Sequence, residues 1–211
     1  MTNTIETIKT LTFGTELEYT HISRQRAAQA IQSVIGGSIR YEGGSYDTWA
    51  VDAPDGRTWK AVSDGSLGDR ATTAEVVSPI LRYEDMDNLQ EIVRALRKAG
   101  AETPECTSQH VHIGVGDWTP RQIANLARIY YKQEVLIMKA VGTLPNRMAH
   151  YTKPTDREFI ERLETAKPTT KDELNKAWFG SYTPNPAHYD NHRYRGLNLN
   201  NVWRTGTVEF R

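Results

Sequence analysis

The residues best suited to chemistry begin with two glutamates, Glu16 and Glu18, in the segment LTFGTELEYT. If this segment is a strand, residues two apart share a face and lie about 6.6–7 Å apart. Carboxylates at this spacing can bind adjacent hard cations such as Mg²⁺. The alternative interpretation is an exposed strand face, because most carboxylates in proteins are simply solvated.

Two histidines repeat this spacing in SQHVHIGV, where His110 and His112 flank one valine. They could bind a metal ion or form a structural pair. A zinc site would need further histidine or cysteine ligands, and Cys106 lies in or before the turn that enters this segment. Because the other candidate ligands are carboxylate oxygens, the sequence favours Mg²⁺ or Mn²⁺ over zinc.

Further carboxylates occur in other candidate strands. Glu75 lies in AEVVSPIL, where an unpaired charge among apolar residues would be costly. Glu209 and Arg211 occur in TVEFR and could form a surface ion pair, which contributes little to stability. At a phosphate site, the glutamate could instead hold metal while the arginine binds phosphoryl oxygens.

Three more residues have two interpretations each. Asp64 in SDGSL is typical of a turn, and Arg193 and Arg195 in RYRGLNLNN could be a solvated basic patch. Combined with the carboxylates and histidines, they suit a cleft for divalent metal and polyphosphate. The sequence contains no GxxxxGK[ST], GxGxxG or GxSxG motif. Side chains and metals would therefore hold any bound phosphates.

Most of these residues need strands to position them. Leu17 and Tyr19 alternate with Glu16 and Glu18, as expected for an antiparallel sheet with one apolar face. Strands are predicted over residues 11–20, 46–52, 57–62, 74–80, 108–115, 193–203 and 205–211. Helices are predicted over residues 23–35, 85–98, 119–141, 155–166 and 171–179, and a loop or lid over 180–190. The pattern indicates an α+β fold.

Composition limits the function classes. The 211 residues suffice for one domain with a substantial core, or for two small ones. Lysine plus arginine and aspartate plus glutamate each number 26. The sequence therefore has no excess of positive charge that would indicate binding to nucleic acid or to a membrane. The single cysteine excludes an internal disulfide. Neither a signal-peptide pattern nor an apolar run of ~20 residues occurs, so a cytoplasmic protein is expected.

Six short motifs carry a family resemblance: FGTELE, DGSL, AEVVSPIL, SQHVHIGV, RYRGLNLNN and TVEFR. In this order they resemble the amidoligase family, which belongs to the glutamine synthetase and γ-glutamylcysteine ligase superfamily. The resemblance covers roughly residues 11–211. It implies a curved, mainly antiparallel sheet like the glutamine synthetase catalytic domain, with helices on the outer face and ATP and metal ions on the concave face.

The resemblance also implies roles by position. The implied metal ligands are Glu16, Glu18, Glu75, His110 and Glu209. The implied nucleotide-side residues are His112, Arg193, Arg195 and Arg211, although which of Arg193 and Arg195 points inward is open. The implied catalytic residues are Glu16, Glu18, Glu209 and Arg211, with Asp64 as a candidate on the substrate side.

The implied function is an ATP- and Mg²⁺- or Mn²⁺-dependent ligase that activates a carboxylate as an acyl phosphate and joins it to an amine. The partners would be small-molecule or peptide substrates. The alternatives are a guanidino kinase-like phosphotransferase, a metal-dependent hydrolase with zinc on the two histidines, and a non-catalytic domain. The sequence leaves the substrates and the oligomeric state open.

A single catalytic domain over residues 1–211 is expected, incomplete at its C-terminus. Related proteins continue beyond the last motif, and a terminal carboxylate at Arg211 would compete for its guanidinium.

Overall fold

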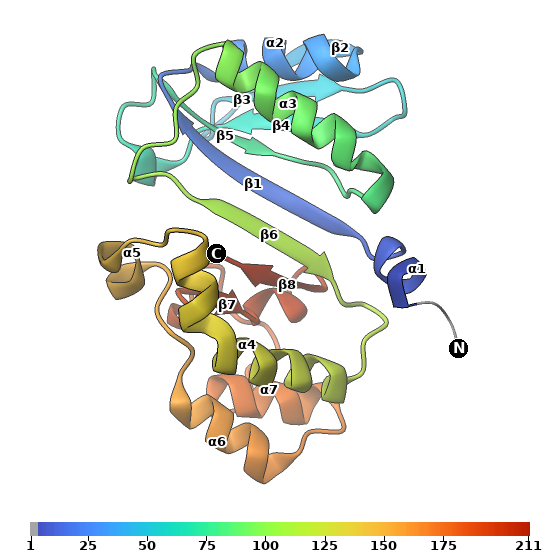
Figure 1. Ribbon diagram of the computed structural model, residues 1–211, viewed down its shortest axis with the longest axis vertical. Coiled ribbons are helices and arrows are strands. Elements are labelled where there is room, and N and C mark those ends of the chain that lie inside the picture. The colour runs from blue at the N-terminus through green and yellow to red at the C-terminus, as the bar shows by residue number, and fades with distance from the viewer. Residues whose placement is uncertain (1–3) are drawn as a thin grey trace. The chain divides into compact units, whose positions relative to one another are not determined.

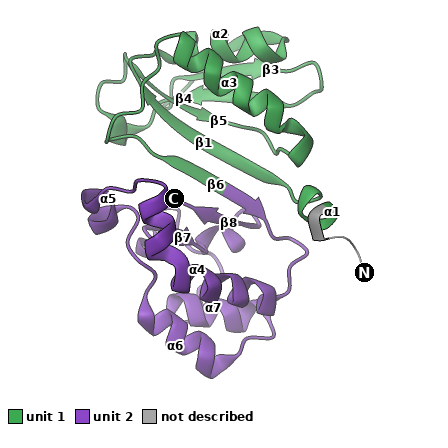
Figure 2. Cartoon of the chain, in the orientation of Figure 1, with its two compact units in different colours: residues 1–111 green, residues 112–211 purple. Residues whose placement is uncertain are grey.

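The computed structural model describes residues 4–211. The chain divides into two compact units, residues 1–111 and 112–211 (Figure 2). The described residues contain seven α-helices and eight strands, so the predicted α+β class is confirmed. The single catalytic domain over residues 1–211 stays a prediction, and its residues 1–3 lie outside the described part.

The first unit contains a sheet with the strand order β2-β3-β4-β5-β1-β6. The strand pairs with a described register, from β2 to β1, are antiparallel. The strands are β1 (Phe13–Thr20), β2 (Ser38–Gly43), β3 (Thr48–Asp52), β4 (Thr58–Val62), β5 (Thr73–Val77) and β6 (Gln109–Gly114), whose last three residues belong to the second unit. The helices are α1 (Thr4–Lys9), α2 (Arg24–Ile35) and α3 (Met86–Lys98), with 3-10 turns at Gly65–Leu67 and Tyr83–Asp85.

The core of the first unit lies between one face of this sheet and the helices α2 and α3 (Figure 1). Leu17 and Tyr19 of β1 are buried in it, together with Ile31 of α2 and Leu96 of α3. Since successive strand residues point to opposite faces, Glu16 and the other residues that alternate with this apolar set face away from the core. Helices therefore cover one face of the sheet in this unit, and the glutamine synthetase-like curvature, with helices on the outer face, stays a prediction.

The second unit packs helices against a short sheet with the order β6-β8-β7. Its elements are α4 (Pro120–Ala140), α5 (Pro145–His150), α6 (Arg157–Ala166), α7 (Lys171–Phe179), β7 (Leu197–Asn198) and β8 (Thr207–Phe210), with 3-10 turns at Asn191–Arg193 and Asn200–Val202. Trp178, Phe159 and Leu163 are buried in its core with Val208 of β8. Thr119 caps α4 in a reciprocal arrangement with Gln122, which explains the predicted start of that helix.

The largest error in the predicted elements is the strand over residues 193–203. Only Leu197–Asn198 pairs as a strand, and 3-10 turns flank it. The side chain of Asn198 accepts a hydrogen bond from the backbone N–H of Asn200 at 2.9 Å, which turns the chain locally. Asparagine side chains compete with a sheet ladder in this way.

Strand β2 was not predicted, because it is mostly exposed and lies at the edge of its sheet. An exposed edge strand lacks the apolar alternation on which strand prediction depends. Residues 180–190 form a loop without helix or strand, as predicted. Among the described helices, none is long and apolar enough to cross a membrane.

Candidate functional site

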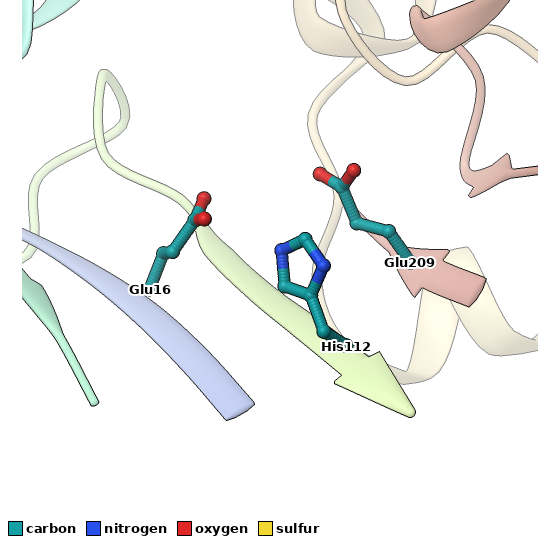
Figure 3. Close-up of side chains that lie close together, drawn as sticks. All are labelled: Glu16, His112 and Glu209. Atoms are coloured by element: carbon teal, nitrogen blue, oxygen red, sulfur yellow. The ribbon is translucent and has the colours of Figure 1, made fainter. Parts of the chain in front are cut away.

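Three of the predicted metal ligands meet on adjacent strands of the first unit. In the antiparallel pairing of β1 with β5, Glu18 lies directly opposite Glu75. Glu16 is two residues from Glu18 on β1, and Figure 3 shows its side chain on this strand. Glu18 is only 4% exposed, so this is not the solvated strand face of the alternative interpretation. Like charges opposite each other destabilise a sheet, which makes the arrangement unusual for a structural surface.

His110 joins this carboxylate cluster. Its Nδ1 lies 2.8 Å from Oε2 of Glu16, and its ring is buried. On the other side of the ring, Nε2 is 3.2 Å from Oγ of Ser108. The backbone N–H of Ser108 donates to Oε2 of Glu18 at 2.7 Å. One segment of the chain therefore orients both a carboxylate and the imidazole.

The carboxylates of the cluster perturb one another. Burial, and after it the charges of Glu16, Asp64 and Glu18 in that order, together raise the pKa of Glu75 to about 8. The carboxylate of Asp64 also accepts a hydrogen bond from the backbone N–H of Ser66, so it shapes a 3-10 turn as well. Crowded acidic groups of this kind favour a proton or a cation among them.

In the second unit, a different set of polar side chains surrounds Glu209. Nδ2 of Asn198 and Nδ2 of Asn201 donate to its Oε2 at 2.7 and 2.9 Å. Nη1 of Arg211 lies 3.5 Å from its Oε1, and both side chains are buried. Two neutral donors and one guanidinium group thus surround the carboxylate of Glu209.

His112 belongs to the same set. Its Nδ1 lies 3.3 Å from Oγ1 of Thr207. Ligand atoms of His112 and Glu209, on β6 and β8, lie within 4.8 Å of one another (Figure 3). An imidazole nitrogen and a carboxylate oxygen at this separation can share a cation.

The two predicted phosphate-side arginines have different surroundings. Arg195 donates to the carbonyl oxygen of Pro154 at 2.7 Å and to Oδ2 of Asp156 at 3.2 Å. Arg193 donates to the carbonyl oxygen of His188 at 2.9 Å. A carboxylate therefore already neutralises Arg195, whereas the described contacts of Arg193 are with a neutral acceptor and with aromatic rings.

A comparison with known protein families gives a match over most of the chain. Residues 9–211 match the model of a family described as "Putative amidoligase enzyme". The chain belongs to this amidoligase family. No curated protein and no solved structure matches the chain.

Three polar residues of this family member were missed as site residues in the sequence analysis. Asn198 and Asn201 hold Glu209, and Ser108 holds Glu18 and His110. The run LNLNN contains a usable signal, because closely spaced asparagines among apolar residues need partners if they are buried. For Ser108 the sequence offers no such signal, because its contact with Glu18 is made by the backbone.

The substitution Glu75→Gln is expected to stabilise the metal-free protein at about pH 8 and to flatten its pH dependence. The folded-state pKa of Glu75, about 8, lies above the ordinary value of 4.5. Between these values the folded state keeps a proton that the unfolded state has released, so stability falls as pH rises. Thermal unfolding in chelator at several pH values measures the slope. Glu91→Gln, on the exposed face of α3, is the control. An unchanged slope in Glu75→Gln would contradict the assignment.

Proposed function

We propose that the chain is an ATP-dependent ligase that activates a substrate carboxylate as an acyl phosphate and then transfers the acyl group to an amine. Membership of the amidoligase family supports amide-bond formation. The observation that carries the proposal is the carboxylate cluster of the first unit, where Glu18 opposes Glu75 and burial raises the pKa of Glu75. Such a cluster weakens a fold, so a functional role is its best explanation.

The donor set fits a hard divalent cation. Carboxylate oxygens, which are the ligands that suit Mg²⁺ and Mn²⁺, predominate, and imidazole nitrogens lie beside them. The residues that would hold the cations are Glu16, Glu18, Glu75 and His110 in the first unit and Glu209 in the second. When bound, the cations would neutralise the phosphate oxygens of ATP.

The remaining residues would bind and orient the reactants. The guanidinium of Arg211 lies beside Glu209 and would offer a fork of donors to phosphoryl oxygens. His112 and the phosphate-side arginine Arg193 would contact the nucleotide. Asp64 would lie on the substrate side. Arg195 is the weaker candidate of the two arginines, because Asp156 already pairs with it.

The proposed reaction balances in two steps. First, a carboxylate oxygen of the substrate forms a bond to the γ-phosphorus, and ADP leaves. Second, the amine nitrogen attacks the acyl carbon, inorganic phosphate leaves, and the nitrogen loses a proton. Buried groups such as Glu209 and Arg211 would keep their own charges fixed in position and away from water during both steps.

The test is ADP release by the purified protein with Mg²⁺ and ATP, while panels of carboxylates and amines are supplied separately and together. We expect ADP release that needs a carboxylate and is increased by an amine, with an amide product in the mass spectrum. Chelator should abolish it, and Mn²⁺ should restore it.

Other outcomes separate the alternatives. Phosphorylation of a guanidino compound without a carboxylate would indicate a phosphotransferase. Zinc in the purified protein, with hydrolysis that is independent of ATP, would indicate a hydrolase. Failure to bind ATP with Mg²⁺ in a calorimeter would indicate a non-catalytic domain.

A further inference from the structure

Gly196, the residue before β7, joins three backbone segments of the second unit. Its N–H donates to the carbonyl oxygen of Lys153 at 3.0 Å, and its carbonyl oxygen accepts from the N–H of Arg211 at 2.9 Å. Lys153 is held a second time, because its own N–H donates to the carbonyl oxygen of Tyr194 at 3.0 Å. The backbone of Gly196 therefore holds Arg211, the residue proposed to bind phosphoryl oxygens.

Two side chains of α4 occupy the space that a side chain at position 196 would need. A β-carbon there would lie against the hydroxyl oxygen of Tyr130 and 2.7 Å from the terminal methyl carbon of Met138. Both of these side chains are buried in the second unit. Non-bonded carbon atoms pack best at about 3.5–4.0 Å. Only glycine therefore allows α4 to lie this close to the backbone before β7.

The two neighbours differ in how easily they can move. The methyl group of Met138 is the end of a flexible side chain and can turn away. The ring of Tyr130 is rigid and packs against the ring of Phe210 at a centroid distance of 5.7 Å. Phe210 ends β8 and directly precedes Arg211. A side chain at position 196 would thus displace the Tyr130 ring and its neighbour Phe210, or else the backbone that holds Arg211.

We propose that Gly196 is a positioning residue for Arg211, and that the Tyr130 ring of α4 sets this position through it. The effect on the reaction rests on the proposed function, whereas the packing and the backbone hydrogen bond do not. A preorganised donor acts on a phosphoryl group only in the productive geometry, and a displacement of about 1 Å can lower a rate by about 10²-fold. Gly196 would therefore control the rate without touching the substrate.

The first test is Gly196→Ala in the full chain. We expect kcat for ADP release to fall by about 10- to 100-fold, with a smaller change in KM for ATP, because a misplaced donor costs most in the transition state. Hydrogen exchange of the Arg211 amide, followed by nuclear magnetic resonance in chelator and without nucleotide, should become faster. The control is Gly116→Ala, whose β-carbon would meet no described atom within 4 Å, and it should match the wild type.

The second test is rescue by Tyr130→Phe. This substitution removes the hydroxyl oxygen that the new methyl group would meet, and it leaves the ring carbon Cζ at 3.5 Å, an ordinary contact distance. Tyr130→Phe alone keeps the ring and its contact with Phe210, so it should keep the wild-type kcat. The double variant Gly196→Ala/Tyr130→Phe should recover most of the kcat and the slow exchange of the Arg211 amide.

A merely structural role of Gly196 predicts a different result. A loss of stability alone would leave kcat per folded molecule unchanged well below the midpoint of thermal unfolding, which is measured for each variant. If Gly196→Ala does not fold, Tyr130→Leu supplies the test, because it removes the ring from Gly196 and Phe210 without adding a clash. It should lower kcat and speed the exchange of the Arg211 amide.

Three results would overturn the inference. These are wild-type kcat and Arg211 exchange in folded Gly196→Ala or Tyr130→Leu, no recovery in the double variant, and an equal loss of kcat in Gly116→Ala. The outcomes also separate the inference from the proposed function. Faster Arg211 exchange in Gly196→Ala, with no ADP release by the wild type, would contradict the ligase assignment alone. ADP release by the wild type, with an unchanged kcat in Gly196→Ala, would contradict this inference alone.

Discussion

Glu16→Gln is expected to lower the rate of ADP release by about 10²–10³-fold, the loss seen when one preorganised electrostatic group is removed from an active site. Its carboxylate contacts His110 and helps to raise the pKa of Glu75. Loss of its charge relieves repulsion in the cluster, so the midpoint of thermal unfolding should stay the same or rise. Glu209→Gln should lower the rate similarly.

Two controls make this result interpretable. Glu84→Gln, at an exposed position before α3, should keep the wild-type rate. Inductively coupled plasma mass spectrometry should show less bound Mn²⁺ for Glu16→Gln than for the control. Wild-type rates of ADP release in both Glu16→Gln and Glu209→Gln would remove the two residues from the site.

Trp178→Ala is expected to destabilise the second unit by about 3–5 kcal/mol, the usual effect of removing a large buried aromatic side chain. Trp178 is 1% exposed, and its ring meets Phe159 edge-on at 4.8 Å. Its Nε1–H donates to Oδ1 of Asn200 at 2.6 Å. The variant therefore leaves a cavity and a buried amide oxygen with one partner fewer. The loss in the free energy of unfolding is measured by chemical unfolding, with circular dichroism and with amide exchange in α6 and α7 as the two readouts.

The matched variant is Trp178→Phe, which keeps an aromatic ring at this position and removes the indole donor and part of the ring volume. It should lose clearly less stability than Trp178→Ala, because a single buried hydrogen bond contributes about 1 kcal/mol. If both variants lost equal stability, the packing against Phe159 would not be the main contribution. If Trp178→Ala unfolded like the wild type, the description of this core would be wrong.

The sequence predicted the elements that have strong local patterns. Alternation of Leu17 and Tyr19 with Glu16 and Glu18 located β1 and the face that carries the acids. A capping residue and an apolar stripe located α4, whose observed bounds differ from the predicted ones by one residue at each end. Such features depend on residues within a few positions of one another, so they can be recognised in a single amino-acid sequence.

Other features depend on residues far apart in the sequence. The pairing of Asp156 with Arg195 joins segments 39 positions apart, and no local sequence pattern predicts it. The pairing of Glu18 with Glu75 follows from strand register, which spacing alone does not specify. The site residues were found as candidates, whereas their partners and the short β7 required the folded chain.

The contact between Nδ1 of His110 and the carboxylate of Glu16 links the orientation of the ring to its tautomer. In the neutral tautomer that donates from Nδ1 to Glu16, Nε2 carries the lone pair and can accept from the Ser108 hydroxyl. Coordination through His110 would use Nε2 and would require only that this hydroxyl rotate away. Glu16, besides helping to hold the cations, would then also orient the ring of His110.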